Sequence, residues 1–187
     1  MQKTSHLGSA PAAPTEPMNK DDQAYDIPEE VEEVIRLLLE GVCDPDTNVR
    51  WSASKGIGRV CGRLPLSLAD QVLEYILELF SEAADDSSWH GACLSVAELA
   101  RRGLLLPKSI PAVVPLIEKA LVYDINRGSY SIGANVRDSA CYVCWACARS
   151  FDAEIMSPFM PKLAPVLMTT ACLDREVNCR RAAAAAF

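Results

Sequence analysis

The chain has 187 residues, eight cysteines and a formal net charge of −7, and half of its residues are hydrophobic. So acidic a chain is poorly suited to a nucleic-acid groove or an anionic membrane surface as its main partner. No apolar run reaches the length of a membrane span, and the N-terminus lacks the apolar core of a signal peptide. Cysteines without a framework spacing favour reduced thiols, so we expect a cytoplasmic protein.

Residues 1–27 are rich in Pro, Ala, Ser and Thr and carry almost no large apolar side chains. Such a segment cannot bury enough surface to offset the chain entropy that folding removes. We therefore expect a disordered tail over residues 1–27. It could act as a linker, although its composition favours a tail without a specific role.

The ordered part begins with two predicted helices separated by a turn. Pro28 suits a first helical turn, and the glutamates after it lie near the positive end of the helix dipole. One apolar stripe at helical spacing consists of Val31, Val34, Ile35, Leu38, Leu39 and Val42. Pro45 cannot continue this helix, and Asp46 is a suitable cap for the next. The expected inward face of that second helix consists of Val49, Ala53, Ile57 and Val60.

Three further helix pairs follow, so the expected array over residues 28–187 has approximate repeats at 28–63, 66–102, 108–150 and 154–187. Pro115 lies inside an expected helix and should kink it, because proline removes one backbone donor. A loop with two glycines is expected from Asp124 to Ala134. The last helix, from Glu176, stops at Phe187 in an alanine-rich run without a polar capping face, so we expect the array to continue.

Small residues recur about every 40 residues, at Ala53, Ala92, Ala140 and Ala182. A period of this length with paired helices is typical of HEAT-type repeats. The sequence therefore predicts an all-α fold, an α-solenoid of HEAT/armadillo-type helical hairpins with about four repeats, the last of them truncated. In such an array the function lies on the surface.

The series Cys141-x-x-Cys144-x-x-Cys147 is the strongest candidate for a metal or redox motif. Steps of three residues drift around a helix, so the three sulfurs do not converge on one tetrahedral centre. Free cysteines also pack as small buried hydrophobes, and we prefer that interpretation. Neither His90 nor any other residue completes a catalytic set, a metal site or a nucleotide loop, so we expect no catalytic residue and no cofactor.

The surface offers six candidate partner-binding residues: Trp51, Lys55, Arg59, Arg63, Tyr142 and Trp145. On a helical wheel Trp51 and Trp145 fall opposite the expected core stripe, and Tyr142 flanks Trp145. The aromatic residues either pack against neighbouring repeats or form an exposed anchor for a partner. The three basic residues are spaced i, i+4 and i+8; they either form a solvated face or steer an acidic protein partner.

Three arginines recur near helix starts, at Arg50, Arg137 and Arg180, beside Asp44, Asp46, Asp138 and Asp174. Two interpretations are open: a ladder of Asp–Arg contacts between successive repeats, or ligand binding. We prefer the structural ladder.

Five segments carry a resemblance to a known family: Val49–Arg59, Trp89–Gly91, Arg101–Pro107, Asn135–Trp145 and Val177–Ala183. In this order, over about residues 29–187, they resemble the tubulin-folding cofactor D family. The resemblance implies a large α-solenoid chaperone of the post-chaperonin tubulin pathway. It implies β-tubulin as a partner, together with tubulin cofactors C and E and an Arf-like small GTPase.

The resemblance further implies assembly and disassembly of the αβ-tubulin heterodimer, in a cytoplasmic and microtubule-associated protein. It implies an activator of GTP hydrolysis by tubulin that is not itself an enzyme. The alternative is a generic HEAT-repeat adaptor for transport or signalling, which accounts for the repeats but not for the matched segments. An enzyme built on HEAT repeats is disfavoured, because the paired His-Glu ligands or the basic groove of such enzymes are absent.

Overall fold

A computed structural model describes residues 27–187, so the tail expected over residues 1–27 lies outside the described residues except for Ile27. Within this range the chain is mainly helical. In chain order the elements are α1 (Glu29–Val42), α2 (Thr47–Cys61), α3 (Leu66–Glu78), α4 (Asp86–Ala100), the 3-10 turn η2 (Pro107–Ser109), α5 (Ile110–Leu121), β1 (Ile125–Asn126), β2 (Ser131–Ile132), α6 (Ala134–Ser150), α7 (Ala153–Met156), α8 (Met160–Leu173) and α9 (Val177–Ala186).

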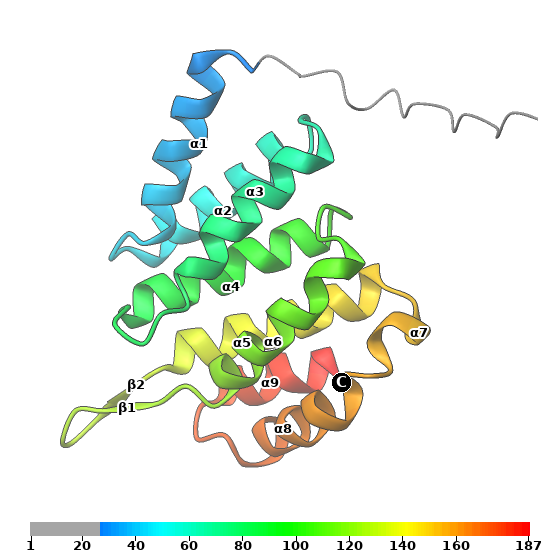
Figure 1. The fold of residues 1–187 in the computed structure, drawn as a ribbon. Coiled ribbons are helices and arrows are strands. Elements are labelled where there is room, and N and C mark those ends of the chain that lie inside the picture. The colour runs from blue at the N-terminus through cyan, green and yellow to red at the C-terminus, as the bar shows by residue number, and fades with distance from the viewer. Residues whose placement is uncertain (1–26) are drawn as a thin grey trace, which may run out of the picture.

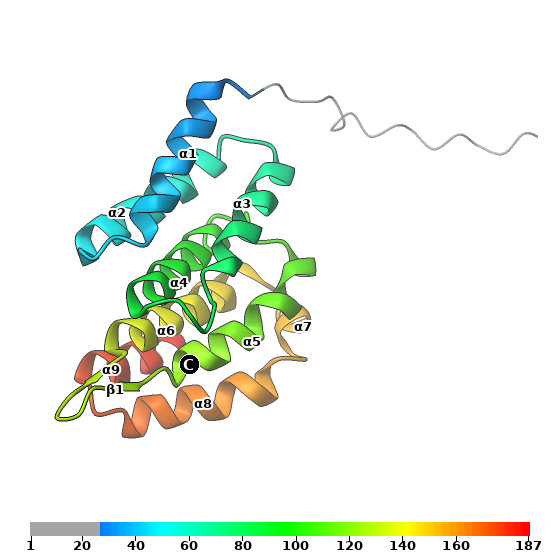
Figure 2. The same cartoon turned by 60° about the vertical axis from the view of Figure 1, so that its left-hand side comes forward.

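The helices form two layers (Figures 1 and 2). In one layer α2, α4, α6 and α9 lie side by side and run in the same direction, each in contact with the next. In the other layer α1, α3, α5 and α8 run roughly opposite to them, and the short α7 joins α6 to α8. This arrangement confirms the predicted all-α solenoid of helical hairpins.

The helix α4 is the centre of the core, because every residue from Trp89 to Ala100 is buried. The Trp89 ring meets Phe80 edge-on at 5.2 Å between ring centroids and lies 5.1 Å from the Tyr123 ring. Its indole Nε1 donates a hydrogen bond of 3.0 Å to the carbonyl oxygen of Ser81. One tryptophan thus joins α4 to the ends of α3 and α5, with its polar atom satisfied.

Aspartate side chains cap two of the inner helices, α2 as expected and also α4. Asp46 caps α2 by accepting a hydrogen bond of 2.7 Å from the Asn48 amide. Asp85 caps α4, where its carboxylate accepts from both the amide and the hydroxyl of Ser88. These contacts satisfy backbone donors that a helix start leaves free, so they fix where each helix begins.

The predicted inward face of α2 is partly wrong. Ala53 and Ile57 are buried, but Val49 is 41% exposed and Val60 is only half-buried. The most buried side of α2 instead includes Arg50, Ser54 and Gly58, because it faces α4. The helical wheel was oriented by apolar residues alone, whereas the buried side carries polar groups that are hydrogen-bonded within the fold.

The segment between α5 and α6 contains a small hairpin where only a loop was expected. Ile125 pairs with Ile132 and Asn126 with Ser131, in antiparallel register. Gly133, which precedes α6, has a φ of +144°, and a Cβ there would lie 2.3 Å from the Tyr123 carbonyl oxygen. Glycine is therefore required at this close approach. The helical span of α5 continues through Pro115.

Candidate functional site

Three aromatic side chains form a row across the layer of parallel helices. Trp51 of α2 and Tyr142 of α6 meet over α4 with their ring centroids 5.7 Å apart. Tyr142 then stacks on Trp145 of the same helix, again at 5.7 Å. We call Trp51, Tyr142 and Trp145 the aromatic row. All three are half-buried, so each packs against its neighbours and still presents part of its ring to solvent.

A cation lies on each end of the aromatic row. Lys55 Nζ lies 5.3 Å from the centroid of the Trp51 ring. At the other end, the Arg149 guanidinium lies 5.2 Å from the centroid of the Trp145 ring. Both distances suit a cation–π interaction. The structure thus brings together four of the six predicted candidates and adds Arg149, which the sequence interpretation missed.

A buried carboxylate lies beneath Tyr142. The side chain of Glu98 is 1% exposed, and its Oε1 accepts a hydrogen bond of 3.0 Å from the Tyr142 hydroxyl. Arg101 lies 3.7 Å from Oε1 and Arg102 lies 3.4 Å from Oε2. The Oε2 atom has no hydrogen-bond partner within the described residues. The carboxylate therefore attracts two guanidiniums toward one spot on the surface.

Gly58 makes room for this arrangement. A Cβ at Gly58 would lie 2.7 Å from Arg102 Nε and 3.3 Å from Glu98 Cβ. Gly56 has the same role toward α1, since its Cβ would lie 2.7 Å from a terminal carbon of Leu38. The two glycines allow α2 to pack closely on both neighbours.

The protonation states at this site are fixed near neutral pH. Burial raises the pKa of the Tyr142 hydroxyl. The hydroxyl therefore stays protonated and donates a hydrogen bond to Glu98. The hydrogen bond from Arg101 to the Tyr142 oxygen raises the pKa of Arg101, so this guanidinium stays charged. At neutral pH the site therefore offers a charged guanidinium at Arg101 and a protonated hydroxyl at Tyr142.

Arg59 and Arg63 continue the basic character of the face. Both side chains are exposed, and within residues 27–187 neither takes part in a hydrogen bond or an ion pair. Arg59 follows Gly58 directly, and Arg63 lies about one helical turn further along. Two of the three predicted basic candidates are thus exposed and without a side-chain partner within the described residues.

The sequence interpretation missed Glu98, Arg101 and Arg102. Their spacing, i, i+3 and i+4, places both arginines on the same side of a helix end as the glutamate. That pattern was visible in the sequence. It indicates only a surface ion pair, however, because the burial of Glu98 depends on Tyr142 from a distant helix.

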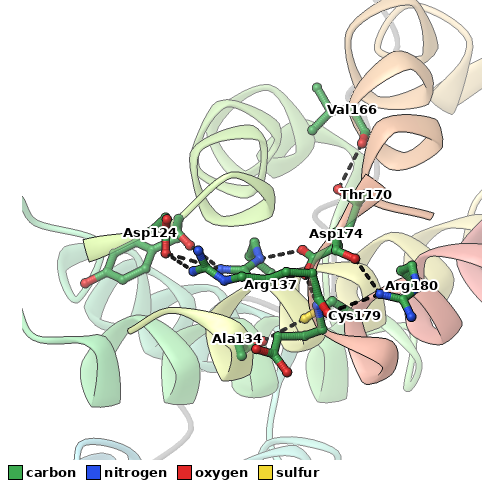
Figure 3. Close-up of polar contacts among 11 residues, drawn as sticks. Asp124, Ala134, Arg137, Val166, Thr170, Asp174, Cys179 and Arg180 are labelled. Carbon is green, nitrogen blue, oxygen red and sulfur yellow. Dashed lines mark hydrogen bonds and ion pairs between the residues drawn. The ribbon is translucent and has the colours of Figure 1, made fainter. Parts of the chain in front are cut away.

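A second polar cluster ties α6 to the turn between α8 and α9 (Figure 3). Arg137 forms two hydrogen bonds to the Asp174 carboxylate, of 2.6 and 3.1 Å, and a third of 2.9 Å to the Tyr123 carbonyl oxygen. Burial is the largest single influence on the pKa of Asp174 and would raise it, but the hydrogen bonds from Arg137 and the Glu176 amide, together with the charges of Arg137 and Arg175, lower that pKa on balance. Arg180 donates to the backbone carbonyl oxygen of Asp174 at 2.6 Å.

The first arginine of the predicted ladder works differently. Arg50 donates to the carbonyl oxygens of Asp44 and Pro45, at 2.6 and 2.8 Å, and its Nε donates to Nδ1 of His90 at 2.8 Å. The structural interpretation is thus correct for Arg137 and Asp174. Arg180 donates to backbone carbonyls in place of aspartate side chains. Arg50 likewise donates to backbone carbonyls, and also to His90 and to the Thr47 and Ser87 hydroxyls.

Two of the clustered cysteines of α6, Cys144 and Cys147, line an apolar hollow of about 560 Å³ between α5, α6, α7 and α8. Cys141, Cys144 and Cys147 are all buried, and burial raises the pKa of Cys141 and Cys147 to about 12. Their thiols stay protonated and unreactive. No group of three or more metal-ligating side chains occurs in the part of the chain that the structure describes.

The helices form two layers that run in opposite directions, and the inner layer carries an aromatic and basic face. This arrangement defines the class of the protein as a helical-repeat solenoid of HEAT/armadillo type. No helix within residues 27–187 is long and apolar enough to span a membrane. A family model described as "Tubulin-specific chaperone D-like, ARM repeats" matches residues 2–187. The chain therefore belongs to this family. The match begins further toward the N-terminus than the resemblance seen in the sequence.

Two curated relatives show the same relationship. The chain is 49% identical to "Tubulin-specific chaperone D" of Dictyostelium discoideum over 149 residues, which cover 77% of this chain and 10% of the relative. It is 34% identical to "Tubulin-folding cofactor D" of Schizosaccharomyces pombe over 181 residues, covering 89% of this chain and 16% of the relative. The chain thus spans only a small part of these relatives. No solved structure matches it significantly.

Proposed function

We propose that this chain is a non-catalytic segment of a tubulin-folding chaperone. It binds β-tubulin and takes part in the assembly and disassembly of the αβ-tubulin heterodimer after release from the chaperonin. The observation that carries the proposal is the 49% identity to a protein named as a tubulin-specific chaperone. The fold supports it, because a solenoid presents an extended surface to a protein client.

Family membership supports the finer parts of the proposal. The chaperone acts with tubulin cofactors C and E, binds an Arf-like small GTPase and promotes GTP hydrolysis by tubulin. This role needs no catalytic residue in this chain, and it places the protein in the cytoplasm near microtubules. The repeats at 28–63, 66–102, 108–150 and 154–187 are the units that would contact these partners.

The direct test is retention of β-tubulin from a cell extract by the immobilised 187-residue chain. Circular dichroism confirms that the bait is helical, and an unrelated helical-repeat protein of similar net charge serves as the control bait. We expect retention by this chain alone. Failure by a well-folded bait would remove β-tubulin binding from this segment.

Crosslinking and mass spectrometry of the full-length parent tests the wider role. We expect β-tubulin and cofactors C and E among the crosslinked proteins. A partner set without tubulin or any of its cofactors would instead favour a generic HEAT-repeat adaptor.

A further inference from the structure

The parallel inner helices bring several cations to one side of an otherwise acidic protein. Because α2, α4 and α6 run in the same direction, their C-terminal ends lie at the same edge of the layer (Figure 1). We call the five arginines at or just after these ends the arginine cluster: Arg59, Arg63, Arg101, Arg102 and Arg149. Cations suit helix C-termini, which carry partial negative charge.

The contacts connect the arginine cluster to the aromatic row. Arg101 donates to the Tyr142 hydroxyl at 3.3 Å, and the Arg149 guanidinium lies over Trp145. Arg102 packs against the backbone of Gly58, the residue before Arg59. The cations and the partly exposed rings therefore belong to one continuous face.

The carboxylate beneath this face does not neutralise it. Glu98 is 1% exposed and faces both Arg101 and Arg102, so one negative charge is shared between two positive ones. The arginine side chains remain 43% and 30% exposed. Glu98 thus holds the two guanidiniums at the surface and leaves N–H groups of each for another acceptor.

We propose that the arginine cluster and the aromatic row bind an acidic peptide segment of a partner protein. Its carboxylates pair with the arginines, and an aromatic or apolar side chain of the segment lies on the aromatic row. Guanidinium groups suit carboxylates because both are planar and can form two parallel hydrogen bonds. Rigid aromatic residues flanked by arginine are typical of the residues that dominate binding energy at protein interfaces.

A protein segment fits better than an extended polyanion. The chain as a whole carries a net charge of −7, which repels a long nucleic acid or an anionic membrane at distance. A short acidic segment needs only the local field of the arginine cluster, which reaches about one Debye length, roughly 8 Å at physiological salt. The inference rests on the proposed function, because a client of the chaperone would supply the segment.

The test uses the 187-residue chain and a fluorescein-labelled peptide of glutamates around one tyrosine, with binding measured by fluorescence anisotropy. The test variant is Arg59→Glu/Arg63→Glu, since neither side chain has an intramolecular partner within the described residues. The matched control is Lys119→Glu/Lys162→Glu, which makes the same charge change on exposed positions of α5 and α8 in the other layer.

We expect the test variant to weaken peptide binding at least about tenfold and the control to change it less than about twofold. Replacing every glutamate of the peptide by glutamine should abolish binding, and replacing its tyrosine by serine should weaken binding several-fold. Equal losses in the two variants would overturn the proposal, because net charge alone would then explain them. Binding that survives the glutamine replacement, or is unaffected by the serine replacement, would overturn it as well.

The test separates this proposal from the proposed function. If the chain retains β-tubulin and the test variant retains it equally, the peptide site is wrong and the chaperone role stands. If the peptide binds through Arg59 and Arg63 while β-tubulin is not retained, the site stands without that client. A single-stranded oligonucleotide that binds this face more tightly than the peptide would overturn the choice of ligand.

Discussion

Arg50 and His90 join α2 to α4 through a buried hydrogen bond of 2.8 Å between Nε and Nδ1. Both side chains are almost fully buried, at 3% exposure each. Since Nδ1 accepts, the imidazole is neutral with its proton on Nε2. A protonated ring could not accept this bond and would face a guanidinium at close range.

This contact predicts a specific dependence of stability on pH. Burial, with the Arg50 charge as the second cause, lowers the pKa of His90 to about 4. In the unfolded chain the pKa is about 6.5, so below that pH the unfolded state binds the extra proton. The contribution of neutral His90 to the free energy of unfolding should therefore be fully present above pH 6.5. It should be lost on acidification toward pH 4, by about 2 kcal/mol between pH 7 and pH 5.

Urea unfolding of the wild type and of His90→Asn, whose amide oxygen can still accept from Arg50, checks this prediction. Burial raises the pKa of Asp138, and this shift favours the folded state as the pH falls. It opposes the effect of His90 but is common to both proteins. The wild type should lose more stability between pH 7 and pH 5 than the variant does. Identical pH profiles would show that His90 titrates in the folded state as it does when unfolded, and would contradict the prediction.

Gly91 marks the closest crossing in the core, where α4 passes the end of α1. A Cβ on Gly91 would lie 1.9 Å from the carbonyl oxygen of Val42 and 2.8 Å from its carbonyl carbon. Backbone atoms cannot move aside as a side chain can. Gly91→Ala should therefore cost about 3 kcal/mol or more, although alanine favours the helix.

Gly56→Ala is the matched control for Gly91→Ala. Its new methyl group would meet the flexible end of Leu38, so its stability should stay within about 1 kcal/mol of the wild type. Thermal unfolding of both variants measures the difference. Equal melting temperatures would mean that α4 and α1 do not cross as closely as described.

The pair of Arg137 and Asp174 should contribute strongly to stability, because both side chains are buried. The two side chains are 7% and 6% exposed, and Asp124 lies 3.8 Å from Arg137 at the same place. Asp174→Asn would leave a buried guanidinium without its main counter-charge, which costs on the order of 3 kcal/mol. The exposed pair of Glu33 and Arg36 provides the control, and Glu33→Gln should leave the melting temperature unchanged.

Val49 and Ile57 of α2 distinguish the observed register from the one predicted by apolar spacing. The apolar spacing predicted that Val49→Asp would place an unpaired charge in the core and cost several kcal/mol. Since Val49 is 41% exposed in the first turn of α2, this change should cost less than about 1 kcal/mol. Ile57→Ala, at 1% exposure, should cost about 3 kcal/mol. Urea unfolding of both variants measures the two costs. If Val49→Asp lowered the denaturant midpoint more than Ile57→Ala does, the register predicted from apolar spacing would be correct and the observed one wrong.

Much of the secondary structure could be predicted because its signals are local. Pro45 and Asp46 mark the start of α2, and the recurrence of small residues indicates paired helices in an array. A helix boundary depends on a few neighbouring residues, whose capping and backbone preferences are present in any chain of that sequence. The same holds for the cysteines of α6, which were predicted to pack as small buried hydrophobes and are buried.

The candidate site could be predicted only in part. Trp51, Lys55, Tyr142 and Trp145 were chosen one by one, but nothing in the sequence indicated that they meet over α4. The burial of Glu98 beneath Tyr142 was equally invisible, as was the polar inner side of α2 at Arg50 and Ser54.

The sequence by itself determined the helices, their pairing and the family, because caps, prolines and apolar periodicity act over a few residues. Only the tertiary structure decided which side of each helix is covered. That depends on contacts between residues about 40 positions apart, such as Arg50 with His90 and Glu98 with Tyr142. A polar residue is buried when a distant partner satisfies its hydrogen bonds, and local sequence does not specify that partner.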